Sequence, residues 1–418
     1  MPEILLTAFE HDTILLRQHP QLTAAHLDAL DHLQQRHQAR WFTRVHQGLR
    51  LHQFVGVVQV AGLTLEILPK AERHTAPDAP QRWRQVLFQL LRVVHDLPVA
   101  VPDVARLAQS PRALLDLFVA AFVQEADALL RQGLARYYHP TEANRPALRG
   151  QMLFAQQIQH NTIRRDRFFT RQQTYDAAHP FNCLLRMALD LAARQVNSPT
   201  LAARTRTLLL HWPELPRVQV PAELPPLGRH TERYRRALEL ALLLLHSQSP
   251  TLASGPTQAL ALLFDMNRLF ERYVARRLQQ AGARVGSHVQ AQASRRLWGS
   301  STLQPDLLVS IPTAAGSVLF VLDTKWKVPV RATPEAEDLR QLYTYCHLWQ
   351  AHHGLLLYPH TAVSPAPVAR PFARSRFAPD IILQAHTYYT QLLTPAGDLN
   401  SALGTELLDY LRATLSAE

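Results

Sequence analysis

The segment from Leu303 to Lys327, LQPDLLVSIPTAAGSVLFVLDTKWK, constrains the fold more strongly than any other part of the chain. Two apolar runs flank a turn-like stretch at 312–317, and the second run, VLFVL, contains no polar residue. A strand that is apolar on both faces is buried on both sides, so it lies inside a sheet and not at its edge. The pattern therefore predicts an antiparallel hairpin at the centre of a sheet.

Each apolar run of this hairpin carries an aspartate at its outer end, Asp306 on the first and Asp323 on the second. If Ile311 faces Val318, the same register places Asp306 opposite Asp323. Residues that are paired in this way project from one face of the sheet, with Cβ atoms about 5 Å apart. An unpaired buried carboxylate is costly, so two of them at one place indicate a bound partner.

Lys325 lies two residues beyond Asp323 and is expected on the same face, whereas Thr324 and Trp326 should point away. Two close carboxylates raise each other's pKa, and Mg²⁺ relieves this repulsion because it prefers carboxylate and phosphate oxygens. The lysine ammonium can position a nucleophile or neutralise a transition state. The two aspartates and the lysine together predict a Mg²⁺ site that cleaves phosphodiesters, with Asp306 and Asp323 as the metal ligands. Aspartates that are simply solvated at an open hairpin end are the alternative.

Two expected helices carry polar residues that could support this site. The helix predicted over 339–350 places Gln341 and Tyr345 four residues apart, on one face. An earlier helix carries Glu271 beside its apolar stripe, where it could act as a third carboxylate. An ordinary amphipathic helix gives the same spacing, so the spacing alone leaves these roles open.

The size and charge of the chain limit its class. With 418 residues it is too long for one core, and about two or three domains are expected. The formal net charge is +11, and nearly all of the basic side chains are arginines. Because the planar guanidinium group binds phosphate in a bidentate manner, this surplus favours a nucleic-acid partner, although a solvated basic surface would give the same charge.

Several features indicate a cytoplasmic protein without a membrane anchor. The cysteines, Cys183 and Cys346, lack a metal-site spacing, which argues for a reducing compartment and against zinc. The first residues, MPEILLTAFEHD, lack the basic and apolar regions of a signal peptide. The most apolar run, ALELALLLLHS, is too short to span a bilayer.

Three segments are predicted along the chain. Residues 1–75 are β-rich, with alternating apolar and polar residues around a turn in the stretch 54–71. Residues 76–250 are mainly helical, because apolar residues recur at helical spacing up to about residue 212. A proline-rich connector at 212–230 interrupts this region.

The third segment, 251–418, is expected to open with a helix over 257–282 that includes Leu263 in its apolar stripe and ends at Gly282. The order of elements that follows is α-β-β-β-α-β. This order predicts a small mixed sheet with helices on its faces.

At this point the motifs resemble a known family. The stretch QPDLL…VLDTKWK resembles the PD-(D/E)xK nuclease signature, and QLYTY resembles the Q-x-x-x-Y element of its RecB-like branch. FDMNRLFERYV, FVGVVQVAGLTLEILPKA and ALRGQMLFAQQIQHN resemble segments of the McrC family, the nuclease subunit of McrBC-type, modification-dependent restriction systems. The resemblance runs from about residue 50 to about residue 360.

This resemblance implies a multidomain α+β protein whose C-terminal α/β domain is restriction-endonuclease-like, with a central mixed sheet. The domain would be a DNA endonuclease that uses Mg²⁺, or Mn²⁺ in its place. Its metal ligands would be Asp306, Asp323 and Glu271. The remaining catalytic and accessory residues would be Lys325, Gln341 and Tyr345.

The resemblance also implies a partner. The N-terminal part would dock on the hexameric ring of a McrB-type AAA+ GTPase, insert into its pore and stimulate GTP hydrolysis. The partner would recognise methylated cytosine in double-stranded DNA. The chain itself has no G-x-x-x-x-G-K-[ST] loop and should not hydrolyse nucleotide alone.

A basic segment, NTIRRDRFFTRQQTYD, is a candidate contact for this partner or for DNA phosphates. Its arginines are Arg164, Arg165, Arg167 and Arg171. A solvated basic face over a small core is an equally acceptable interpretation.

Two other functions remain open at this point. The chain could be a self-sufficient RecB-like DNA nuclease in repair or defence. It could also be a non-catalytic adaptor that uses a nuclease fold only for binding, although the presence of Asp306, Asp323 and Lys325 disfavours this.

Overall fold

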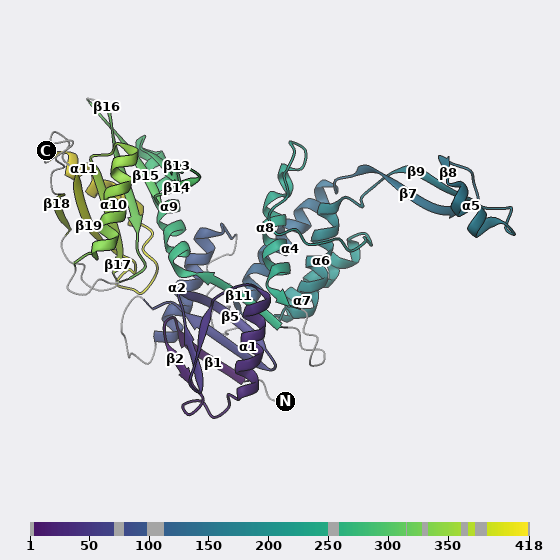
Figure 1. The fold of residues 1–418 in the computed structure, drawn as a ribbon, viewed down its shortest axis with the longest axis horizontal. Coiled ribbons are helices and arrows are strands. Elements are labelled where there is room, and N and C mark those ends of the chain that lie inside the picture. Colours follow the sequence, from purple (N-terminus) through teal and green to yellow (C-terminus); the bar gives the residue numbers. More distant parts are fainter. Residues whose placement is uncertain are drawn as a thin grey trace. The chain divides into compact units, whose positions relative to one another are not determined.

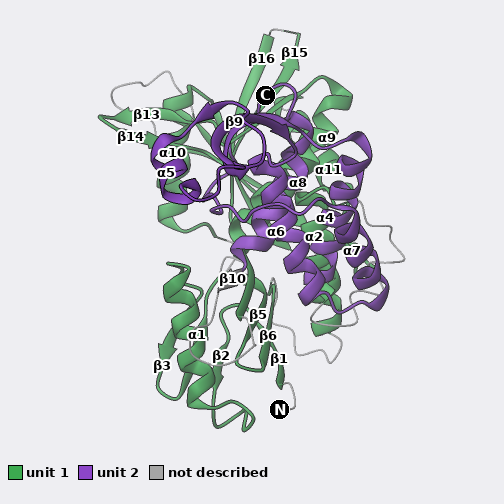
Figure 2. Cartoon of the chain, turned by 90° about the vertical axis from the view of Figure 1, so that its right-hand side faces the viewer, with its two compact units in different colours: residues 1–114, 249–418 green, residues 115–248 purple. Residues whose placement is uncertain are grey.

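The computed structural model describes residues 4–70, 79–97, 113–249, 259–314, 316–327, 333–360, 367–372 and 383–416. The chain forms two compact units (Figure 2). The first comprises Met1–Leu114 together with Ser249–Glu418, and the second comprises Leu115–Gln248. The predicted segments 1–75 and 251–418 are therefore grouped in one unit and do not form separate compact bodies.

A shared sheet explains this grouping. Its strand order is β1-β6-β5-β11-β10. The strands are β1 (Ile4–Phe9), β6 (Leu63–Leu68), β5 (Phe54–Val60), β11 (Ala259–Asp265) and β10 (Gln248–Ser249). The hairpin expected within 54–71 is confirmed, since β5 and β6 pair in antiparallel fashion. β11 pairs antiparallel with β5, so a strand from the end of the chain completes the N-terminal sheet.

The prediction of one helix over 257–282 is wrong at both ends. Residues Ala259–Asp265 form β11, and helix α9 spans Met266–Val285. The short run ALALLF fits a buried strand as well as a helix, and here the strand is formed because β5 offers an edge. Asp265 then caps α9 by accepting hydrogen bonds from two backbone amides, and Gly286, at φ 72°, ends it in place of Gly282.

The N-terminal region also contains a helix that the β-rich prediction omits. Helix α1 (Ala24–Arg36) buries Leu27, Leu30 and Leu33 in the same apolar core as the N-terminal sheet. A small sheet of order β2-β4-β3 accompanies it. Its strands are β2 (Thr13–Leu15), β4 (Gly48–Leu51) and β3 (Phe42–Val45).

The largest sheet is mixed and has the strand order β12-β15-β16-β17-β19-β18 (Figure 1). Its strands are β12 (His288–Ala291), β15 (Leu307–Thr313), β16 (Gly316–Thr324), β17 (His353–His360), β19 (Gln384–Gln391) and β18 (Val368–Pro371). β16, β17 and β19 run parallel, and the other neighbours pair antiparallel. The predicted hairpin is therefore the interior pair β15–β16.

Helices cover this sheet on both faces. Helix α10 (Ala336–Trp349) packs Leu342 against Val321 of β16. Helix α11 (Leu403–Ser416) lies on the opposite face, where its Tyr410 ring contacts His386 of β19. Successive strand residues alternate between faces, so the buried interior strands need apolar residues on both sides.

The contact between α9 and α11 depends on Gly404. A Cβ atom at this position would lie 2.2 Å from the carbonyl oxygen of Arg277 in α9. We expect Gly404→Ala to lower the free energy of unfolding by about 2 kcal/mol, because backbone atoms of one helix must shift. Gly228→Ala is the control, since only the Thr231 hydroxyl lies near its Cβ, at 3.8 Å. Equal urea midpoints for the two variants would contradict this packing.

The second unit consists of helices and a polar sheet. Its helices are α4 (Ala113–Gln132), α6 (Pro180–Gln195), α7 (Pro199–His211) and α8 (Arg235–His246). A single 3-10 turn, η1 (Glu232–Tyr234), directly precedes α8. The proline-rich stretch 213–230 contains no helix or strand, as its prolines predict.

We call the sheet and its short helix, residues 137–176, the arm (Figure 1). Its strands have the order β7-β9-β8. They are β7 (Tyr137–Arg145), β9 (Phe168–Asp176) and β8 (Gln151–Met152), with helix α5 (Phe154–Asn161). The helical prediction for 76–250 is wrong here, because strands with few buried residues lack the apolar alternation that would reveal them. Within the described residues, no helix is both long and apolar enough to cross a membrane.

Candidate functional site

The register of the β15–β16 hairpin agrees with the sequence prediction. Ile311 pairs with Val318, and the ladder continues in step to Leu307 and Leu322. Asp306 directly precedes β15 and Asp323 lies near the end of β16. The ladder therefore brings both aspartates to one end of the sheet.

Asp306 is held by Thr324. The Asp306 Oδ2 atom accepts hydrogen bonds from the backbone amide of Thr324 at 2.6 Å and from its hydroxyl at 2.7 Å. The prediction that Thr324 points away from the site is thus wrong, because Asp306 lies outside the regular ladder and can turn toward it. Burial raises the pKa of Asp306, and the hydrogen bonds from Thr324 and the Lys325 charge oppose this rise.

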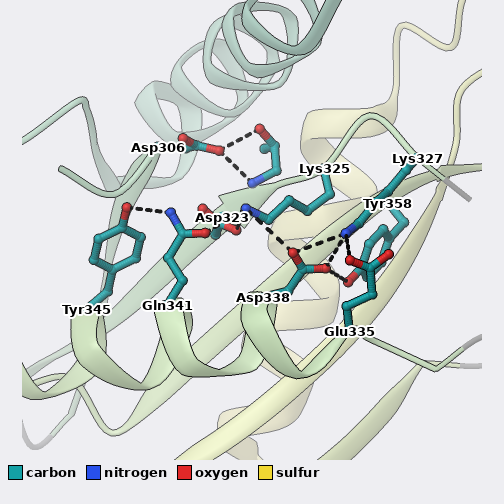
Figure 3. A network of polar contacts seen from close by, with 10 residues as sticks. Asp306, Asp323, Lys325, Lys327, Glu335, Asp338, Gln341, Tyr345 and Tyr358 are labelled. Atoms are coloured by element: carbon teal, nitrogen blue, oxygen red, sulfur yellow. Dashed lines mark hydrogen bonds and ion pairs between the residues drawn. The ribbon is translucent and has the colours of Figure 1, made fainter. Parts of the chain in front are cut away.

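Asp323 and Lys325 form an ion pair beside it (Figure 3). The Asp323 side chain is buried, and Lys325 Nζ lies 2.7 Å from its Oδ2. Burial, together with the nearby charge of Asp306, raises the pKa of Asp323 to about 7, although Lys325 opposes the shift. The site therefore holds two carboxyl groups that disfavour each other's ionisation.

Helix α10 orients the lysine through a chain of hydrogen bonds. Lys325 Nζ donates to Gln341 Oε1 at 2.8 Å, and Gln341 Nε2 donates to the hydroxyl oxygen of Tyr345 at 2.8 Å. These contacts fix which side of the Gln341 amide faces the lysine. Of the two helix residues singled out in the sequence, Gln341 thus contacts Lys325 directly, and Tyr345 contacts Gln341 (Figure 3).

Asp338 belongs to the same network, but the sequence interpretation gave it no role. Its carboxylate accepts a hydrogen bond from the hydroxyl of Tyr358 at 3.1 Å and pairs with Lys327 at 2.9 Å. Lys325 Nζ lies 3.9 Å away. The available signal was its position three residues before Gln341, on nearly the same side of one helix.

Glu271, on α9, lies near Asp306 but is engaged by another residue. Its Oε1 accepts a hydrogen bond from Gln292 Nε2 at 2.9 Å. Burial raises the pKa of Glu271, and the charge of Asp306 raises it further. In the described parts of the chain, no three or more His, Cys, Asp or Glu side chains form a group that could hold a metal ion.

The two aspartates nevertheless fit a hard divalent cation. Asp323 Oδ2 is buried, and its contact with Lys325 lacks the geometry of a hydrogen bond. A cation at this end of the sheet would give Asp323 Oδ2 the partner that it lacks and would remove the repulsion between Asp323 and Asp306. Mg²⁺ suits such a site, because it commonly uses one or two carboxylates and keeps several waters.

The strand end that carries Lys325 is attached to the N-terminal sheet. Trp326 Nε1 donates a hydrogen bond to Glu10 Oε1 at 2.7 Å, and the backbone amide of Lys70 donates to the same oxygen at 2.7 Å. The Trp326 ring also packs against Phe270 of α9, with centroids 5.3 Å apart. Glu10 is fully buried, and this burial raises its pKa to about 7.

The arginines predicted as a contact surface lie on the arm, in the second unit. Arg164, Arg165 and Arg167 follow α5 in a turn, and Arg171 is on β9. Arg171 forms an ion pair with Glu142 of β7. All four arginines belong to the second unit, whereas the aspartate–lysine site belongs to the first.

Together these features describe a class: a multidomain α+β protein with a carboxylate–lysine site at the end of a mixed sheet. Residues 49–359 match the model of the McrBC 5-methylcytosine restriction system component family. The match covers most of the chain, so this protein belongs to the McrBC family, as the sequence resemblance to McrC predicted.

One solved structure shows the same fold over nearly the whole chain. McrC bound to McrB AAA+ hexamers in a half-complex of the tetradecameric assembly from Thermococcus gammatolerans is 20% identical, with a TM-score of 0.62 and 95% coverage of both chains. A second match, in the McrBC complex from that organism, has a TM-score of 0.45 at 20% identity, over 65% of this chain and 86% of the other. No curated protein matches the chain.

Proposed function

We propose that the chain is the DNA endonuclease subunit of a McrBC-like restriction system and that it cleaves phosphodiester bonds with Mg²⁺. The observation that carries this proposal is the hairpin register, which gathers Asp306, Asp323 and Lys325 at one end of the sheet. A buried acidic pair with raised pKa values beside an oriented lysine is typical of functional sites. Phosphodiester hydrolysis uses all three groups.

The topology supports a restriction-endonuclease-like domain of the PD-(D/E)xK kind. Helix α9 is followed by β12, β15 and β16, then by α10 and β17. This is the α-β-β-β-α-β order expected from the sequence, with an added hairpin formed by β13 (Arg295–Trp298) and β14 (Ser301–Leu303). The proposed catalytic residues lie on β16, on α10 and directly before β15.

Each residue would have a distinct part in the reaction. Asp306 and Asp323 would hold Mg²⁺, with Glu271 as a third acidic group close to Asp306. The bound ion would supply charge neutralisation and an activated water. Lys325 would stabilise the negative charge that builds on the phosphate, because its ammonium group is aimed at the carboxylate pair by its contact with Gln341.

The partner would be a McrB-type AAA+ GTPase hexamer that recognises modified double-stranded DNA and whose GTP hydrolysis this chain stimulates. Fold similarity to a hexamer-bound McrC over 95% of the chain supports this assignment. We assign the arm as one contact with the ring, because apolar side chains that would normally be buried are exposed on it. Examples are Phe154 at 73%, Ile158 at 68% and Ile163 at 94% exposure.

Charge reversal on the arm tests this contact. We expect Arg164→Glu with Arg165→Glu to weaken assembly with the GTPase ring at least about tenfold, because exposed basic residues beside an apolar patch attract an acidic partner surface. Arg206→Glu with Arg229→Glu, also exposed and in the same unit, is the matched control. Size-exclusion chromatography and titration calorimetry with the partner provide the measurement. Unchanged assembly together with unchanged DNA cleavage would remove the arm from the interface.

Cleavage of modified plasmid DNA in the presence of Mg²⁺ tests the function as a whole. A restriction subunit should be nearly inert alone and active once the GTPase partner and GTP are added. Full activity without the partner would instead identify a self-sufficient nuclease. Absence of cleavage under both conditions, with intact assembly, would identify a non-catalytic adaptor.

A further inference from the structure

A second hairpin projects from the first unit beside the candidate site. Among the strands that the structure describes, β13 (Arg295–Trp298) and β14 (Ser301–Leu303) form a sheet of their own (Figure 2). Gly299, at φ 56°, lies in the tight turn between them, where a left-handed backbone is needed. Every residue of β13 is exposed.

The base of this hairpin is attached to the proposed metal site. The backbone amide of Gln292, just before β13, donates a hydrogen bond to the carbonyl oxygen of Asp306 at 2.9 Å. The side chain of Gln292 donates to Glu271 at 2.9 Å, and Gln304 Nε2 donates to the Gln292 carbonyl at 2.9 Å. The hairpin therefore emerges directly beside two proposed acidic ligands.

Arg295 fixes the hairpin from the other side. Its Nη1 donates to the carbonyl oxygen of Leu348 at 2.9 Å, and its guanidinium carbon lies 5.4 Å from the centre of the Trp349 ring. Both partners belong to α10, the helix that also carries Gln341. A two-stranded ribbon is marginally stable alone, so these contacts at its base determine its position.

The outer part of the hairpin is apolar and basic, and it has no use in the core. Trp298 is 84% exposed and Leu297 is 49% exposed, with the exposed Arg296 next to them. The surrounding sequence is also free of negative charge. From 272 to 305 the chain contains six arginines and no aspartate or glutamate. An aromatic ring among basic groups suits a nucleic acid, whose sugars and base edges offer apolar surface in a groove and whose phosphates bind arginine.

We propose that the β13–β14 hairpin binds the double-stranded DNA substrate beside the phosphate that is cut. Trp298 packs against sugars and the apolar edges of bases, such as thymine methyl groups, in a groove, and Arg296 binds a neighbouring phosphate. A two-stranded ribbon fits into the major groove, and its attachment through Gln292 fixes the distance from the groove to the proposed metal site. This inference rests on the proposed nuclease function, for which it names the substrate-contacting element.

DNA binding without cleavage gives the most direct test. Fluorescence anisotropy of a labelled DNA duplex is measured with the full-length chain carrying Asp323→Ala, so that the DNA stays intact. Adding Trp298→Ala should weaken binding about tenfold, because the burial of one large apolar side chain is lost. Trp298→Phe keeps an aromatic ring and should retain most of the affinity. Leu210→Ala, at a residue 85% exposed in the second unit, is the control and should change nothing.

Salt dependence tests the arginine separately. Arg296→Ala should lower the slope of log affinity against log salt concentration by about 1, as expected for one lost phosphate contact. Trp298→Ala should leave that slope unchanged, since an apolar contact releases no counterions.

Two outcomes would overturn the inference. Unchanged DNA affinity in Trp298→Ala and Arg296→Ala would show that the hairpin does not contact the substrate. Lost assembly with the GTPase at unchanged DNA affinity would make the hairpin a protein-docking element instead. Failure of the proposed function looks different, because the complete system would then either not cleave DNA at all or cleave it equally fast with the wild type and with Asp323→Ala, whatever the hairpin variants do.

Discussion

Asp323→Ala is expected to reduce DNA cleavage at least about 1,000-fold in the complete system of chain, GTPase partner, GTP and Mg²⁺. Asp323 is the buried member of the carboxylate pair and the ion-pair partner of Lys325, so its loss removes a metal ligand and releases the lysine. Assembly with the partner should persist, because the Asp323 side chain is only 3% exposed and so contributes almost nothing to the protein surface.

The cleavage rate and the assembly of this variant should be measured together. Asp409→Ala provides the control, since it removes an exposed carboxylate from α11 in the same unit. Cleavage at the wild-type rate by Asp323→Ala would refute a catalytic role for the pair. Loss of both cleavage and assembly would indicate misfolding, and Asp323→Asn, which keeps the shape of the side chain, separates this case.

Glu10→Gln is expected to stabilise the first unit at alkaline pH by up to about 3 kcal/mol. Burial raises the pKa of Glu10 from 4.5 to about 7, so the folded protein binds a proton more readily than the unfolded chain. The wild type therefore loses stability as the pH rises through about 7. The glutamine cannot ionise and keeps an acceptor oxygen for Trp326 and Lys70.

The pH dependence distinguishes this effect from a general change in stability. The difference between Glu10→Gln and the wild type should be small near pH 4.5, grow up to about pH 7 and stay constant above it. Urea unfolding followed by tryptophan fluorescence measures it, with the exposed Glu223→Gln as control. A glutamine variant that is no more stable than the wild type at alkaline pH would show that the pKa of Glu10 is not raised in the folded protein.

The hairpin and its register were predictable from local sequence. The strand VLFVL is apolar on both faces, which identifies it as an interior strand. Once Ile311 is paired with Val318, the partner of every other residue in the hairpin is determined. The helix carrying Gln341 and Tyr345 was predictable for the same reason, since helical spacing places both residues on one face. Patterns of this kind depend on neighbours a few residues away.

The remaining contacts of the site depend on residues that are distant in the chain. Trp326 and Glu10 are separated by 316 positions, and neither has a local signal that names its partner. The bond from Thr324 to Asp306 arises because the ladder stops at Leu307, and a strand end is among the least predictable features of a sequence. The role of Asp338 likewise requires Tyr358 and Lys327 to come together.

The fold was misjudged where apolar periodicity was short or absent. The run ALALLF became β11 because β5 had an open edge, a tertiary cause that no local pattern shows. The arm was assigned to the helical region because β7 contains no buried residue, and its sequence, YYHPTEANR, does not alternate apolar and polar residues.

Anomalous scattering from crystals of the full-length chain soaked in Mn²⁺ tests the proposed metal site most directly. We expect one strong anomalous peak within coordination distance of carboxylate oxygens of both Asp306 and Asp323, and we expect this peak to be lost in Asp323→Ala. The contrary result is an absence of manganese between the two aspartates in the wild type, or the same peak retained in the variant.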